Sequence, residues 1–123
     1  MTGKAYEPRA FCSPSKHFGT SEDVVWRVPV EAQEAVQRKR LKPHLLVAAL
    51  NQLDDRMLAA RYQHDLVVLI RAALDDRRLS LKDHAAHEGF DYTRTTRMLR
   101  GEIVMKLEDI AAQHRTLGIA YPV

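Results

Sequence analysis

The sequence predicts a mainly α-helical protein, built as a helical bundle with an extended N-terminal arm. Residues 44–78 contain neither glycine nor proline, and apolar residues recur there at three- and four-residue steps, the period of a helix face. Runs of strand-forming residues are few and short. The 123 residues, of which 46% are hydrophobic, suffice for one domain with a buried core.

The first third of the chain predicts an arm, a short strand and a helix. In residues 1–23, two prolines, two glycines and scattered aromatic residues break any regular period, so we interpret this segment as an arm outside the core. Residues 24–28 have the composition of a short strand. Pro29 suits the first turn of a helix, whose apolar side would continue through the basic run at residues 38–42.

Pro43 is expected to end that helix and to begin the next one. Residues 44–78 then form either one long helix or two. We favour a break near residues 62–65, because the Asp65 side chain can cap a second helix of ordinary length.

The helix expected over residues 43–61 has a broad apolar face that predicts a dimer. This face carries Leu46, Leu50, Leu53 and Met57, which follow one another at 4-, 3- and 4-residue steps. An apolar stripe of this kind needs cover on a protein in water. We therefore expect residues 24–61 to form the dimerisation element of a symmetric homodimer.

Residues 79–118 predict two short helices across a tight turn, followed by a third helix. Ser80 and Asp83 have the spacing of a helix start, and Gly89 suits the left-handed position that ends a helix. Asp91 can cap a second helix, which Gly101 would terminate. Two helices joined in this way make a helix-turn-helix, whose second helix fits the major groove of DNA.

Residues 66–119 resemble the lambda-repressor-like (Xre-type) helix-turn-helix family. The likeness is carried, in order, by LIRAALDDRRLSLKDHA, by the turn Gly89-Phe90, by DYTRTTRMLRG and by KLEDIAAQHRTLGI. Ala85 matches the small residue that lets two helices cross closely. The resemblance implies that the recognition helix spans residues 91–100.

The sequence also departs from the family pattern at four positions. His84, Glu88 and Thr95 stand where aliphatic residues are usual, and Lys106 stands where a serine commonly caps the last helix. We therefore expect a more polar seam between the second helix of the domain and its neighbours.

The resemblance implies that residues 62–123 form a domain that binds double-stranded DNA. Arginine can donate two parallel hydrogen bonds to guanine, and threonine offers a hydroxyl and a methyl group. The residues expected at the start and on the outer face of the recognition helix are Tyr92, Thr93, Arg94, Thr96 and Arg97. Arg94 and Arg97 lie one turn apart and are expected to share a face. Ser80 and Lys82 are placed to meet backbone phosphate.

The net charge of +3 lies entirely in the first 43 residues. These hold eight Lys and Arg against five Asp and Glu, while residues 44–123 hold eleven of each sign. A basic run can neutralise phosphates, although such runs are also common on solvated helix faces. The charge is therefore compatible with nucleic-acid binding without requiring it.

Other features argue against a membrane, metal or catalytic role. No apolar run approaches the ~20 residues of a membrane span, and we expect no signal peptide. The single cysteine, Cys12, fits a reducing cytoplasm. His84 and His87 lack a third ligand at suitable spacing, so we expect neither metal nor cofactor. Nucleophile elbows, phosphate-binding loops and paired cysteines are missing, which predicts that the chain is not an enzyme.

Together these observations predict a sequence-specific, dimeric transcription regulator, in the manner of a bacterial or phage repressor, on palindromic operator DNA. The alternative is a protein-interaction module, antitoxin-like or an adaptor, that keeps the helical scaffold and binds a protein through residues 43–61. The polar departures favour the alternative, whereas the arginines of the recognition helix favour DNA.

Overall fold

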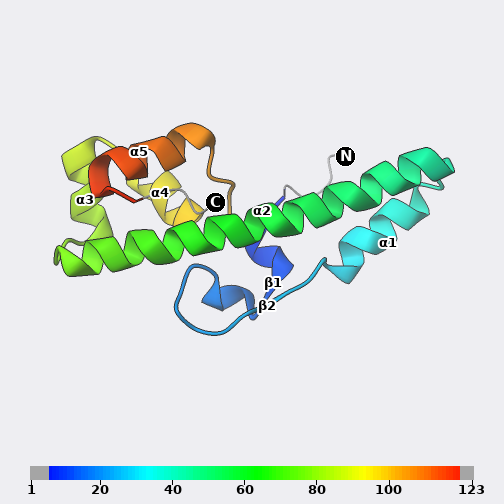
Figure 1. The fold of residues 1–123 in the computed structure, drawn as a ribbon, viewed down its shortest axis with the longest axis horizontal. Helices are drawn as coiled ribbons and strands as arrows, with labels where there is room; N and C mark the ends of the chain where they lie inside the picture. Colours follow the sequence, from blue (N-terminus) through cyan, green and yellow to red (C-terminus); the bar gives the residue numbers. More distant parts are fainter. Residues whose placement is uncertain (1–5, 120–123) are drawn as a thin grey trace.

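The computed structural model describes residues 6–119, which are mainly helical (Figure 1). Two short 3-10 helices and a two-stranded antiparallel sheet precede the α-helices. In chain order the elements are η1 (Pro8–Phe11), β1 (Cys12–Ser13), η2 (Ser15–His17), β2 (Val25–Trp26), α1 (Val30–Arg38), α2 (Pro43–Asp76), α3 (Leu81–Glu88), α4 (Tyr92–Leu99) and α5 (Leu107–Leu117). The predicted helical fold class is confirmed at this level.

Helix α2 runs the whole length of the molecule, with α1 beside its first half and α3, α4 and α5 around its second half (Figure 1). Its 34 residues give a rod of about 50 Å. Pro43 occupies its first turn, as predicted. The break predicted near residues 62–65 is wrong, and the boundary between residues 61 and 62 falls inside this continuous helix.

Packing explains why α2 does not break. Ala60, Gln63, Val67 and Ile70 keep a helical period across the junction, and all four are buried. A capping side chain contributes about 1 kcal/mol. Burial of this continuous face outweighs the local preference of Asp65 to start a new helix.

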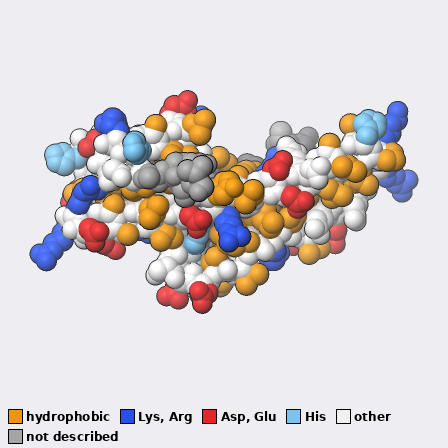
Figure 2. All heavy atoms as spheres, viewed as in Figure 1, with side chains coloured by type: hydrophobic (Ala, Val, Ile, Leu, Met, Phe, Trp, Pro, Cys, Tyr) orange, Lys and Arg blue, Asp and Glu red, His pale blue; other side chains and the backbone are white. Residues whose placement is uncertain are grey.

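Helix α1 forms a hairpin with the first half of α2, against which it packs. The prediction that α1 continues through the basic run is wrong. The helix ends at Arg38, and Arg40 adopts a left-handed conformation with φ of 49° in the connection to α2. Figure 2 shows blue basic side chains gathered at the end of the molecule where this hairpin turns.

The N-terminal segment belongs to the core, so its interpretation as an arm outside the core is wrong for the described residues; residues 1–5 lie outside them. Phe11, Cys12 and Phe18 are buried, and η1 packs against α2. The strand predicted at 24–28 is confirmed for Val25–Trp26, which pairs antiparallel with Cys12–Ser13. Aromatic packing and sheet pairing, which join distant residues, override the irregular local sequence.

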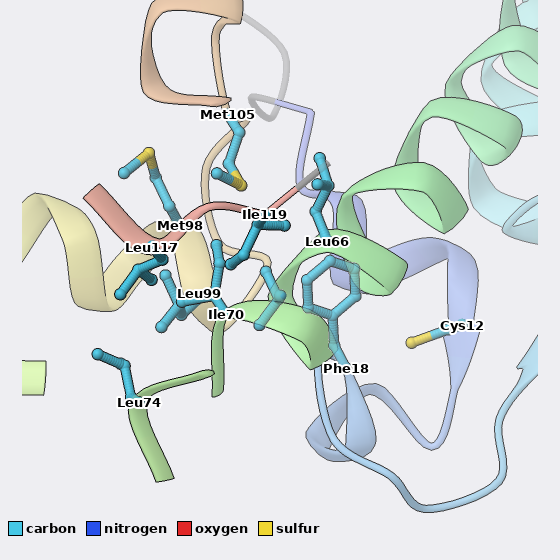
Figure 3. Packing of buried hydrophobic residues seen from close by; sticks show 11 residues of the cluster. Cys12, Phe18, Leu66, Ile70, Leu74, Met98, Leu99, Met105, Leu117 and Ile119 are labelled. Carbon is cyan, nitrogen blue, oxygen red and sulfur yellow. The ribbon is translucent and has the colours of Figure 1, made fainter. Parts of the chain in front are cut away.

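The main core lies between the second half of α2, the helices α4 and α5, and the N-terminal segment (Figure 3). Its buried side chains are Cys12, Phe18, Leu66, Val67, Ile70, Leu74, Met98, Leu99, Met105, Leu117 and Ile119. Phe18 is only 2% exposed within this cluster. Residues 62–119 therefore share their core with residues 12–18 and are not packed as a separate unit.

Candidate functional site

The candidate site is built on α3 and α4, which contact each other across a three-residue turn. The Ser80 hydroxyl accepts a hydrogen bond from the Asp83 amide at 3.0 Å and caps α3. Gly89 ends that helix with φ of 73°. The Asp91 carboxylate then accepts from the Arg94 amide at 2.9 Å and caps α4. The predicted helix starts and the turn glycine are confirmed.

The outer face of α4 presents polar and basic side chains to solvent. Thr93, Arg97 and Arg100 are exposed and recur at 4- and 3-residue steps, so they lie along one face. Tyr92 is also exposed, and Thr96 is partly exposed. Arg100 is not among the residues predicted to contact DNA, although its three-residue spacing from Arg97 indicates a shared face.

Arg94 lies one turn before Arg97, but its guanidinium is held in an ion pair. Its Nη1 and Nη2 atoms donate to the two carboxylate oxygens of Asp109 on α5, at 2.6 and 2.8 Å. The same carboxylate also accepts from the Lys106 amide at 2.8 Å. Hydrogen bonding to Arg94 lowers the pKa of Asp109, and the same bond raises the pKa of Arg94. This two-pronged ion pair joins α4 to α5 and leaves Arg97 as the more available arginine.

Ser80 and Lys82 lie at the start of α3, and both are exposed. The Ser80 oxygen accepts the capping hydrogen bond, so the hydroxyl hydrogen remains able to donate to a phosphate oxygen. Lys82 stands beside Asp83, whose carboxylate is also exposed. The two predicted phosphate-binding residues are therefore accessible, as such a role requires.

The polar departures from the family pattern have polar partners. Buried His84 places Nε2 3.2 Å from Oε1 of buried Gln113 on α5, and its ring packs edge-on against Phe90 at 5.6 Å between centroids. Thr95 donates its hydroxyl hydrogen bond to the Asp91 carbonyl within α4. Glu88 lies 3.7 Å from Arg115 of α5 in an ion pair. The expected polar seam is present.

The predicted dimerisation stripe is partly covered within the chain. Leu53 is 5% exposed and belongs to the interior, so its assignment to a dimer surface is wrong. Leu46 and Met57 are partly buried, and Leu50 is 36% exposed. The reason is that α1 and η1 pack against α2 and cover one side of it. Exposed leucines and valines remain on α1 and on the first half of α2, namely Val30, Leu45, Val47, Leu50 and Leu58.

Comparison of the chain with protein-family models, with curated proteins and with solved structures found no match. Within residues 6–119, no helix is both long enough and apolar enough to cross a bilayer. In the same part of the chain, no three His, Cys, Asp or Glu side chains are grouped as a metal ion would require.

Proposed function

We propose that this chain is a sequence-specific DNA-binding transcription regulator, a bacterial or phage repressor that binds palindromic operator DNA as a homodimer. In this proposal α3 and α4 act as a helix-turn-helix, and α4 is the recognition helix. The lambda-repressor-like resemblance of residues 66–119 supports the same assignment. The proposal assigns no catalytic step, metal or cofactor to the chain.

The observation that carries the proposal is the exposed face of α4. Arg97 and Thr93 lie there together on a helix that is capped at its start and contains no acidic residue. A helix of this size fits the major groove, where a guanidinium can grip guanine and a threonine can meet a phosphate, a base or the thymine methyl group. Met98 and Leu99 are buried beneath this face and anchor it to the core.

A dimer supplies the second half of the proposed binding surface. One recognition helix covers only a few base pairs, so specific operators usually contain two half-sites about one helical turn apart. Val47 and Leu50 are exposed apolar residues one turn apart on α2, and they are the surface we assign to subunit pairing. A symmetric dimer through this surface would present both α4 helices to the same side of DNA.

Arg97→Ala is expected to weaken binding to the preferred DNA site by ~1–3 kcal/mol, because the two hydrogen bonds to a base are lost. Fluorescence anisotropy with a labelled duplex measures the change, and circular dichroism checks that the fold is kept. The matched control is Arg38→Ala, which removes an exposed positive charge at the far end of α1. An equal loss of DNA affinity in the two variants would contradict the proposal that Arg97 recognises a base.

Leu50→Asp is expected to convert the dimer into a folded monomer, because it places an unpaired charge in the proposed seam. Sedimentation equilibrium measures the mass, which should fall to the 14.1 kDa of a single chain. Leu69→Asp is the control, since Leu69 is an exposed leucine of α2 that lies outside the hairpin. A monomeric unmodified protein, both free and on DNA, would contradict the dimer.

The second candidate function is a protein-interaction module. It is favoured by exposed apolar side chains where α2, the 100–106 connection and α5 meet, above all Leu107, which is 77% exposed. Tyr62, Val104 and Leu107 line a small cavity of about 160 Å³ there. Raising the salt concentration separates the two functions, because phosphate neutralisation loses affinity steeply with salt whereas apolar contact does not.

A further inference from the structure

Arg71 lies on α2 beside the C-terminal end of α4, and its guanidinium is poorly satisfied. Its Nη2 atom is 3.5 Å from the Leu99 carbonyl oxygen, the outer limit of a hydrogen bond. Its Nε atom is buried and has no hydrogen-bond partner within residues 6–119. A guanidinium carries five N–H donors, and the contact with Leu99 is the one hydrogen bond that the Arg71 guanidinium makes within residues 6–119.

Arg100 brings a second positive charge to the same place. It directly follows Leu99, the residue whose carbonyl faces Arg71. Burial lowers the pKa of Arg71, and the charge of Arg100 lowers it further, while Asp75 acts in the opposite direction. The Arg71 guanidinium therefore lies near the backbone of Arg100, and within residues 6–119 neither side chain is paired with a carboxylate.

A capping role for Arg71 does not account for this arrangement. A cation at the C-terminal end of a helix is favourable when it bonds the last carbonyl groups. Arg71 makes one long contact of that kind and leaves Nε unpaired. The terminal Nη1 and Nη2 atoms of a guanidinium can donate two parallel hydrogen bonds to phosphate oxygens, so two neighbouring guanidiniums are better matched to an oxyanion than to a single carbonyl.

We propose that Arg71 and Arg100 form a phosphate clamp at the C-terminal end of α4. Arg100 shares the exposed face of Thr93 and Arg97, so a nucleic-acid backbone lying along α4 would reach it. Arg71 projects from α2 toward the end of α4, where its Nη2 atom meets the Leu99 carbonyl. This inference rests on the proposed DNA-binding function for the source of the phosphate, although free inorganic phosphate has the same oxyanion chemistry.

The clamp is tested first by DNA binding of Arg71→Gln and Arg100→Gln. Each variant should lose affinity for preferred and random duplexes alike. Each should also make the dependence of log K on log salt concentration shallower by about 0.9, the contribution of one phosphate. Arg38→Gln is the matched charge control. Because Arg100 is exposed, its replacement leaves the core intact and keeps the test decisive if Arg71→Gln unfolds.

The arginine Nε–H resonances of the unmodified protein provide a second readout by NMR. Titration with inorganic phosphate should move the Arg71 Nε–H signal in a saturable way, and Arg100→Gln should abolish that shift. A short DNA duplex should move the same signal. The phosphate arm does not depend on DNA binding, so it reports on the clamp separately from the proposed function.

The outcomes distinguish the two claims. If the unmodified protein binds DNA but both glutamine variants keep its affinity and salt slope, the clamp is overturned and the proposed function stands. If the unmodified protein does not bind DNA, the proposed function fails and the phosphate titration decides the clamp. A saturable shift that requires Arg100 then supports an anion site, and an unmoved Arg71 signal overturns it.

Discussion

Gly19→Ala is expected to lower the free energy of unfolding by about 2–5 kcal/mol, the sum of backbone strain and overpacking. Gly19 has φ of 73°, a left-handed conformation that disfavours any side chain. A Cβ there would also collide with the Val67 side chain and would lie 2.8 Å from the Leu99 carbonyl oxygen. Chemical denaturation followed by circular dichroism measures the loss.

Gly89→Ala and Gly118→Ala are the matched controls for this prediction. Both glycines have a similar positive φ, but within residues 6–119 a Cβ at either position would have no atom within 4 Å beyond the glycine itself and its two chain neighbours. These variants should show backbone strain alone, about 1–2 kcal/mol. If Gly19→Ala were no more destabilising than Gly89→Ala, the N-terminal segment would not be packed against α2 and α4 as the structure shows.

Gln63→Leu is expected to cost about 2–6 kcal/mol, because it leaves the Ile103 carbonyl and the Met105 amide unpaired at about 1–3 kcal/mol each, while the Met98 carbonyl keeps its bond to the Gly101 amide. The buried Gln63 amide donates to the Met98 and Ile103 carbonyls at 2.9 and 3.0 Å, and its oxygen accepts from the Met105 amide at 3.0 Å. The side chain thus ties α2 to the end of α4 and to the connection that leads into α5.

Denaturant unfolding tests this prediction, with hydrogen exchange at the Met105 amide as a local readout of the lost bond. Gln52→Leu provides the control, since it makes the same change at an exposed position of α2. A loss below about 1 kcal/mol for Gln63→Leu, the size of one ordinary hydrogen bond, would contradict the bridging role.

The helix ends of α3 and α4 could be predicted because their causes are local. Ser80 and Asp91 each cap a helix through an amide three residues away, and Gly89 needs only its own backbone freedom. Packing of the N-terminal segment could not be predicted in this way. The Gly19 amide donates to Nδ1 of His64, 45 residues distant, at 2.8 Å, and the rings of Phe18 and Trp26 pack edge-on against His64.

The candidate site shows the same division between local and distant causes. Helical spacing alone places Thr93 and Arg97 on one face of α4, and the structure shows both exposed. The ion pair of Arg94 with Asp109 joins residues 15 apart, so it depends on how α5 packs against α4. Arg100 follows Arg97 at the same helical spacing, so its place on this face could also have been predicted from the sequence.

In vitro selection of bound duplexes from a random DNA pool by the unmodified protein tests the central claim most directly. The proposed function predicts an enriched palindromic consensus, with two half-sites whose centres lie about 10 base pairs apart, one turn of DNA. A pool that remains random through successive rounds, at salt concentrations low enough for phosphate contacts to hold, would contradict sequence-specific DNA binding by this chain.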